Sequence, residues 1–290
     1  MKIGTVFAST GGNKLARSIR SFHRMEPQLN LHVVFDVGSN SWQQRNHGTT
    51  QWVEARHYVK TRYFPANRAH INGTLNEGMR WMAELGFDHV LLLHDDLIFS
   101  PLWRHRHALS KWFDKAPVGT GMRFAHLETF VPDTDSRRRS EDWDREDLEG
   151  KSLWRFLTKY NKFHDGWELR PPGASFWFKY EGPDKVRKWN RLGPTAQLVP
   201  VKSWAEVGGF DEHDGIFYDQ HYPSECFKRK MAPVWAVPNF PHIHLHNQSM
   251  NPWGDPAPGP WGDSMLAFEK RYGANWAGFW KDDWEEKWHD

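Results

Sequence analysis

The feature that most constrains this chain is the stretch LLLHDD at residues 91–96, an apolar run that ends in two adjacent carboxylates. A continuous apolar run, rather than an alternating one, indicates a strand buried on both faces of a parallel sheet. Ligands of open α/β sheets bind beyond the carboxyl ends of the strands, so Asp95 and Asp96 are candidates for a ligand site. Their oxygens would suit Mg²⁺ or Mn²⁺ bridging to phosphate, whereas a helix cap or a solvated turn explains the same spacing equally well.

The residues around this stretch predict alternating strands and helices. Strands are expected at 2–9, 31–39, 57–64 and 87–96, and helices at 14–25 and 72–86. Apolar residues recur at helical spacing in both helical segments, and the second strand runs into Asp36 and a Gly-Ser turn. This order predicts an α/β fold with a mixed, mainly parallel sheet flanked by helices.

The second half of the sequence is less regular. Residues 133–150 are nearly all polar and predict a loop or flap, and the stretch from 171 to 201 predicts further strands and turns. A helix is expected after Pro223, and short extended runs are expected at 233–238 and 242–246.

The C-terminal tail follows a Pro/Gly-rich linker at 251–263 and has a stripe of tryptophans at i, i+4 spacing: Trp276, Trp280, Trp284 and Trp288. Helices that lie on membrane surfaces usually carry Lys and Arg on the polar face, but here that face is mostly acidic. The stripe therefore predicts a helix that packs against the domain or against a second copy of the chain, as in a homodimer.

Length and composition exclude several classes of protein. With 290 residues and 39% hydrophobic content, the chain suits one large domain or one domain with an appendage. Its single cysteine, Cys226, excludes an intramolecular disulfide, and no apolar run approaches the roughly 20 residues of a membrane span. The first residues lack the apolar core of a signal peptide, so a soluble, cytoplasmic protein is expected. A net charge of +2 neither requires nor excludes a nucleic-acid partner.

Two further clusters carry residues suited to chemistry. In an extended HIHLH segment, His242, His244 and His246 share one face, where imidazole can bind Mn²⁺ or Zn²⁺; neutral, hydrogen-bonded histidines are the alternative. The segment 208–222, GGFDEHDGIFYDQHY, gathers carboxylates that could supply a general base or could form a solvated loop. The chain has no G-x-G-x-x-G after the first strand, no P-loop, no G-x-S-x-G and no H-E-x-x-H.

Taken together, these stretches resemble GT-A glycosyltransferases, closest in pattern to glycosyltransferase family 2. Members of that family have, in order, a strand ending in Asp and Gly-Ser, an Asn/Gly-rich helix, a strand with an acidic pair, a GGFDE turn, an acidic motif before a helix and a late His. This chain has VVFDVGS, NGTLNEGMRWM, LLLHDD, GGFDE, YDQH and HLHNQS in the same order over residues 2–249. The resemblance implies the Rossmann-like GT-A fold of nucleotide-diphospho-sugar transferases.

The resemblance also implies domains and an activity. Residues 1–250 would form the catalytic domain, with a nucleotide-sugar-binding half at 1–122 and an acceptor-binding half at 123–250, and residues 251–290 would be the linker and Trp-rich helix. The activity implied is metal-dependent, hexosyltransferase-like transfer from a nucleotide-diphosphate sugar, with a UDP-sugar favoured, to an acceptor hydroxyl.

Donor and metal roles carry over by position. Asp36 would contact the base or ribose and Asp95 the ribose, with Ser9 and Asn76 also in the donor-binding set. Asp96 would hold Mn²⁺ or Mg²⁺ on the diphosphate, and His246 or His244 would be a second ligand to that metal. Adjacent carboxylates repel each other, which is an independent reason to expect a cation there.

The implied catalytic roles fall on the acidic segment. Asp219 would be the general base, which implies inversion at the anomeric carbon, and Asp211 would help to bind the acceptor or the donor sugar. The chain departs from the family pattern at His94, where an acidic or small residue is usual, and at Tyr218 and His221, which replace acids.

The acceptor stays open between alternatives. A glycan or other soluble hydroxyl compound could stack on Trp167, Trp177 or Trp189. A hydroxymethylated base of DNA could enter the site with its phosphates on basic residues: Arg137, Arg138, Arg139, Lys179, Lys185, Arg187 and Lys188. The acidic residues that follow Arg139 weaken the second reading. A non-catalytic module that binds nucleotide sugars or glycans is the third alternative.

Overall fold

The structure is a computed structural model that describes residues 2–9, 11, 13–37, 48, 50–65, 70–99, 119–124, 127–130, 187–189, 196–212, 218–237, 242–246 and 270–271. The strands are β1 (Ile3–Ser9), β2 (Leu31–Asp36), β3 (Val59–Phe64), β4 (His89–His94), β5 (Leu97–Phe99), β6 (Gly121–Phe124), β7 (Leu127–Phe130), β8 (Arg187–Trp189), β9 (Gln197–Pro200), β10 (Val234–Val237) and β11 (His242–His246). The helices are α1 (Asn13–Met25), α3 (His70–Glu84), α8 (Val201–Val207) and α9 (Tyr218–Lys228). None of the helices in these described ranges is both long and apolar enough to cross a membrane.

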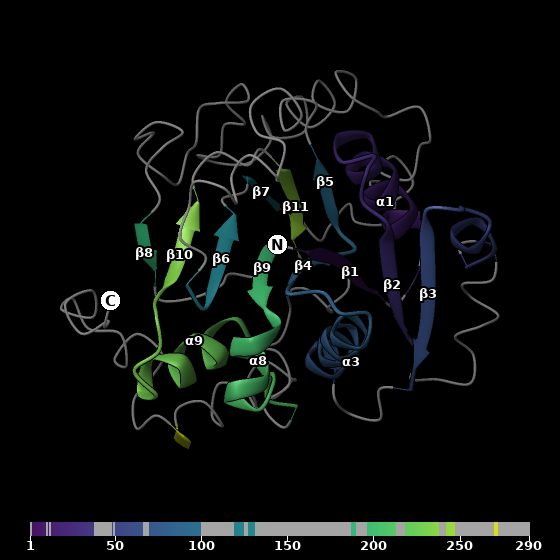
Figure 1. The fold of residues 1–290 in the computed structure, drawn as a ribbon. Coiled ribbons are helices and arrows are strands. Elements are labelled where there is room, and N and C mark those ends of the chain that lie inside the picture. The colour runs from purple at the N-terminus through teal and green to yellow at the C-terminus, as the bar shows by residue number, and fades with distance from the viewer. Residues whose placement is uncertain are drawn as a thin grey trace.

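The main sheet has eight strands in the order β3-β2-β1-β4-β9-β6-β10-β8 (Figure 1). Strands β3, β2, β1 and β4 are parallel, β9 is antiparallel to both of its neighbours, and β8 pairs antiparallel with β10 at the edge. A smaller sheet follows the order β5-β11-β7. The chain passes from β1 outward to β2 and β3 and then returns to β4 on the other side of β1. The carboxyl ends of β1 and β4 thus form a topological switch point, where open α/β sheets bind ligands.

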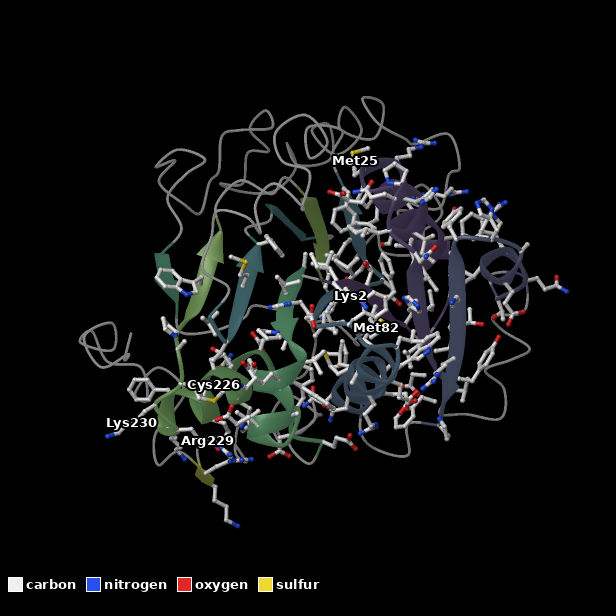
Figure 2. The ribbon with its side chains drawn as sticks, in the orientation of Figure 1. Lys2, Met25, Met82, Cys226, Arg229 and Lys230 are labelled. Carbon is white, nitrogen blue, oxygen red and sulfur yellow. The ribbon has the colours of Figure 1, made fainter. Side chains whose placement is uncertain are left out.

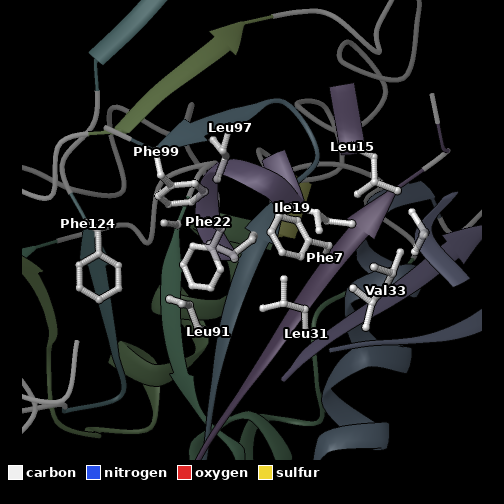
Figure 3. Packing of buried hydrophobic residues seen from close by; sticks show 14 of the residues in the cluster. Phe7, Leu15, Ile19, Phe22, Leu31, Val33, Leu91, Leu97, Phe99 and Phe124 are labelled. Carbon is white, nitrogen blue, oxygen red and sulfur yellow. The ribbon is translucent and has the colours of Figure 1, made fainter. Parts of the chain in front are cut away.

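The two faces of the main sheet have separate apolar cores. On one face, α1 packs Leu15, Ile19 and Phe22 against Phe7 of β1 and Leu91 of β4 (Figure 3). On the other face, α3 packs Leu75, Met79 and Met82 against the sheet, together with residues of α8 and α9. Figure 1 shows α3, α8 and α9 grouped together along the lower side of the view. Strands β1 and β4 therefore contribute buried side chains to both cores, as the continuous apolar run of β4 predicted.

Two glycines allow α3 to lie close to β1. A Cβ built on Gly78 of α3 would lie 2.5 Å from Cγ1 of Val6, and one on Gly4 of β1 would lie 2.5 Å from Sδ of Met82. Each distance is far shorter than a van der Waals contact. At Gly4 the flexible end of Met82 could move aside, but at Gly78 the β-branched Val6 could not, so a side chain at Gly78 would push the helix away from the sheet. The close approach sets the distance of α3 from β1, and the helix runs back from the carboxyl end of β3 toward the amino ends of the strands.

The structure confirms most of the elements expected from the sequence, including the first four strands, both early helices and the short extended runs near 233–238 and 242–246. The prediction of a helix only after Pro223 was wrong, because α9 begins five residues earlier, at Tyr218. Pro223 lies inside the helix and lacks the N–H that would bond to the carbonyl of Asp219, one turn before it. The stretch 201–207 was not predicted as a helix but forms α8.

Candidate functional site

The carboxyl ends of three neighbouring strands bring together three of the residues expected to bind the donor. Ser9 ends β1 and Asp36 ends β2, and Asp95 follows β4 directly. The Ser9 hydroxyl donates a 2.6 Å hydrogen bond to the carboxylate of Asp95, and the Gly11 N–H donates to the same Ser9 oxygen at 2.8 Å. Ser9 and Asp95 are both buried, whereas Asp36 is half-buried. We call Ser9, Asp36, Asp95 and Asp96 the carboxyl-edge site.

Helix α1 holds the turn that carries the acidic pair. The Ser18 hydroxyl lies 2.7 Å from the backbone carbonyl of Asp95 and 2.5 Å from that of Leu97, so it bridges both ends of the turn. One turn further along the helix, the Ser21 hydroxyl accepts a 3.2 Å bond from the N–H of Phe99. Sequence reasoning missed both serines, because nothing in their helical spacing distinguishes them from solvent-facing residues. Through them, the orientation of the acidic turn depends on the packing of α1.

The expected metal ligands lie on two adjacent segments. Asp96 is 6% exposed and immediately precedes β5, and β5 pairs antiparallel with β11 so that His244 is opposite Leu97. His244 is thus paired with the residue directly after Asp96, and His246 follows two residues further along β11. A carboxylate with an imidazole from the neighbouring strand is a donor set that suits Mn²⁺ or Mg²⁺ better than a structural zinc site, which would require more nitrogen or sulfur ligands. Within the described residues, no group of three or more His, Cys, Asp or Glu side chains is placed to hold a metal.

Asn76, the fourth expected donor-binding residue, lies elsewhere. Its side-chain NH₂ donates to the carbonyl of Phe210 at 2.7 Å and to the carboxylate of Glu212 at 2.8 Å. Its side-chain oxygen accepts from the indole N–H of Trp204 at 2.9 Å and from the N–H of Phe210 at 2.8 Å. Two donors and two acceptor positions are the full capacity of an amide, so Asn76 uses that capacity to hold the GGFDE turn, residues 208–212, on α3.

The GGFDE turn itself depends on backbone conformations that favour glycine. Gly208 and Gly209 both have φ of 90°, in the left-handed region, and Gly208 caps the end of α8. The following Phe210 is buried against Tyr222 of α9 with ring centroids 5.6 Å apart. Asn72 of α3 donates a 2.5 Å bond to the carbonyl of Asp211. The turn is therefore fixed to both α3 and α9.

A pocket of about 410 Å³ lies between α3, α8 and α9, and Asp211, the second expected catalytic residue, lines it. We call it the GGFDE pocket. The guanidinium of Arg271 contacts the carboxylate of Asp211 and donates a 3.1 Å bond to that of Glu225. His221 also lines the pocket; its burial, aided by the positive charge of Arg271, lowers its pKa to about 4. The imidazole of His221 is therefore neutral near pH 7.

Asp219, the expected general base, lies in the first turn of α9 and is 6% exposed. Unlike His221 two residues later, it is not among the described residues that line the GGFDE pocket. The Tyr222 hydroxyl of α9 donates a 2.6 Å hydrogen bond to the carbonyl of Thr120, which holds the helix against the sheet.

The single cysteine, Cys226, also lies in α9 and is buried, whereas Arg229 and Lys230 follow the last residue of the helix (Figure 2). Burial raises the pKa of the Cys226 thiol to about 12, so it is not a nucleophile near pH 7.

The residues proposed for acceptor binding are mostly outside the described part of the chain. Arg187, Lys188 and Trp189 form β8, at the edge of the main sheet. The remaining ones lie outside the described residues: Trp167, Trp177, Arg137, Arg138, Arg139, Lys179 and Lys185. The polar stretch 133–150, the linker 251–263 and the four tail tryptophans also lie outside them.

Comparison with known proteins identifies the fold. No protein-family model and no curated protein sequence matches the chain. Among solved structures, GalNAc-T7 with UDP, GalNAc and Mn²⁺ matches with a TM-score of 0.53 and 10% identity, over 85% of this chain and 44% of that one. S. aureus TarS matches with a TM-score of 0.51 and 9% identity, over 93% of this chain and 39% of that one. Residues 1–349 of TarS match with a TM-score of 0.50 and 9% identity, over 84% of this chain and 60% of that one.

This chain therefore spans at most 60% of the length of these solved chains. At this level of identity the likeness shows the fold: the chain has the GT-A fold of glycosyltransferases, with a mixed, mainly parallel sheet flanked by helices.

Proposed function

We propose that this chain is a metal-dependent glycosyltransferase, which moves a sugar from a nucleotide-diphosphate sugar to an acceptor hydroxyl with inversion. One observation carries the proposal: the 2.6 Å hydrogen bond between Ser9 and Asp95 at the switch point of a GT-A sheet, with buried Asp96 beside it. A UDP-sugar is the favoured donor, because a solved structure of the same fold holds UDP and Mn²⁺.

In this proposal the carboxyl-edge site binds the donor. Asp36 and Asp95 would face the nucleoside, with Asp95 held in place by Ser9 and by the contact of Ser18 with its backbone. Asp96, together with His246 or His244, would hold Mn²⁺ or Mg²⁺. Such an ion supplies positive charge where the departing diphosphate becomes more negative. The protein's own contribution would be a buried acidic turn held by hydrogen bonds from Ser9 and Ser18, so little reorganisation would be needed when the donor binds.

Asp219 would act on the acceptor. The acceptor oxygen forms a bond to the anomeric carbon while the bond from that carbon to the diphosphate breaks, and the Asp219 carboxylate takes the hydroxyl proton. Displacement on the face opposite the leaving group inverts the anomeric configuration. Asp219 lies in the first turn of α9, where the helix dipole favours its charged form. A residue that acts only on the acceptor should not affect donor binding.

Transfer from a panel of nucleotide sugars, measured with and without Mn²⁺, tests the proposal. We expect one donor class to be consumed only with the metal, and ¹H NMR of the first product to show the inverted anomer. Asp219→Asn should lower kcat by about 10²–10⁴-fold. It should leave the Kd for the donor unchanged, because the substitution keeps the size of the side chain and lies outside the carboxyl-edge site.

The matched control is Asp88→Asn, an exposed acid just before β4, at the opposite end of that strand from Asp95. Donor binding without turnover of any sugar, in the presence of a broad set of hydroxyl acceptors, would instead favour a nucleotide-sugar-binding module. An Asp219→Asn variant with full kcat would remove Asp219 from the mechanism.

A further inference from the structure

Arg271 joins three segments that are far apart in the sequence. It belongs to the C-terminal part of the chain, 60 residues after Asp211 and 46 residues after Glu225. One arm of its guanidinium contacts Asp211 in the GGFDE turn, and the other contacts Glu225, midway along α9. The fork geometry of arginine allows one side chain to bind two carboxylates at once, which a lysine ammonium does less well.

The exposed fractions of the side chains indicate that Arg271 shields Asp211 and Glu225 from water. The side chain of Arg271 is 38% exposed, whereas those of Asp211 and Glu225 are 18% and 19% exposed. Two carboxylates that are largely removed from water and lie close together repel each other unless a cation stands between them. Without Arg271, the repulsion would act between the GGFDE turn and α9.

These contacts lie on either side of the segment 213–217, which connects the GGFDE turn to α9. Asp211 precedes that segment, and Asp219 follows it in the first turn of α9, six residues before Glu225. Fixing both ends of a connecting segment reduces the number of conformations that the joined elements can adopt. The Arg271 contacts therefore restrain the orientation of α9.

We propose that the docking of Arg271 at the GGFDE pocket, through Asp211 and Glu225, restrains α9 and makes Arg271 a positioning residue for Asp219. The part that concerns Asp219 rests on the proposed glycosyltransferase function; the docking itself does not. In this proposal Arg271 acts through α9, which it contacts at Glu225. Removal of Arg271 should loosen α9 and slow transfer without weakening donor binding.

Hydrogen exchange followed by mass spectrometry on the full-length chain tests the docking. We expect Arg271→Ala to speed exchange in 208–212 and in the first turns of α9 by about tenfold, with no change in β1 or β4. Lys270→Ala removes the same charge from the neighbouring residue and should leave exchange unchanged. The Asp211→Asn, Glu225→Gln double variant removes the repulsion, so adding Arg271→Ala to it should have little further effect.

Kinetics test the positioning role. Arg271→Ala should lower kcat by about tenfold with the KM for the donor unchanged, and Arg271→Lys should restore part of that loss. Unchanged exchange in α9 after Arg271→Ala would overturn the docking, whatever the activity. Faster exchange in α9 with a normal kcat would overturn the positioning role alone. If the wild-type chain transfers no sugar, the proposed function fails, and the exchange measurement still decides the docking.

Discussion

Two buried polar regions of this fold differ in what their hydrogen bonds do. At the carboxyl-edge site, neutral hydroxyls from β1 and α1 hold an acidic turn at the switch point of the sheet. Around the GGFDE pocket, the amide of Asn76 and the guanidinium of Arg271 bind groups that connect α3, α8 and α9 to one another. The first arrangement holds carboxylates at the edge where open α/β sheets commonly bind ligands, and the second joins the elements of the scaffold.

The difference has a physical consequence. Buried, uncharged hydroxyls hold Asp95 and the turn that follows it, and added salt weakens these hydrogen bonds little. The bridge made by Arg271 is partly exposed, so added salt weakens it more strongly. We therefore expect substitutions in the first region to change donor binding and those in the second to change the stability of the fold.

The largest effect on stability should come from Asn76→Ala. It removes four hydrogen bonds and leaves the Phe210 backbone and the Trp204 indole to find new partners. Buried groups left without partners cost about 1–3 kcal/mol each, so the free energy of unfolding should fall by about 3 kcal/mol. Urea unfolding at neutral pH measures this, with Asn30→Ala, an exposed asparagine, as the control.

For any Asn76→Ala protein that still folds, the Kd for UDP with Mn²⁺ should equal that of the wild type. A stable variant with weakened UDP binding would show that Asn76 takes part in donor binding, and the two regions would then not differ in function as proposed.

A smaller effect should appear on acidification. Burial, together with Arg271, lowers the pKa of His221 to about 4 from an ordinary value of 6.5, while Asp211 and Glu225 act in the opposite sense. As the pH falls, the His221 imidazole is therefore protonated in the unfolded chain before it is protonated in the folded one. The stability contributed by the neutral imidazole is complete above pH 6.5 and is lost as the pH falls toward 4.

Between pH 7.5 and pH 5, this loss should amount to about 1–2 kcal/mol for His221. His32, whose pKa burial also lowers to about 4, should contribute similarly from the core of the sheet. Urea unfolding at the two pH values should show a smaller decrease for His221→Gln than for the wild type, and the control Asn30→Ala, at an exposed residue that does not titrate, should match the wild type. An identical decrease in the free energy of unfolding of all three proteins would show that His221 does not contribute to the acid sensitivity.

The sequence allowed the fold to be predicted because its strongest signals are local. The continuous apolar run of β4 and the helical spacing in α1 and α3 each depend on packing that the strand or helix imposes on its own residues. The early start of α9 could not be predicted in this way, because Pro223 suggests a helix boundary unless tertiary packing holds the preceding turn.

The roles of individual polar residues were harder to predict. Ser9 and Asn76 looked alike as donor-binding candidates, and only the tertiary structure separates them, since one meets Asp95 and the other meets the GGFDE turn. The partner of Asp211 is 60 residues away in sequence, so no local pattern reveals it. Ser18 acts on a turn 77 residues away, which sequence spacing cannot indicate.

The measurement that tests the central claim most directly is calorimetric titration of UDP into the wild type, Asp96→Asn and Asp211→Asn, each with and without Mn²⁺. If the carboxyl-edge site binds the diphosphate through a metal, the wild type should bind UDP tightly only with Mn²⁺. Asp96→Asn should then lose at least about tenfold in affinity, and Asp211→Asn, from the other region, should bind as the wild type does. Equal, Mn²⁺-dependent binding of UDP by Asp96→Asn and the wild type would contradict the account.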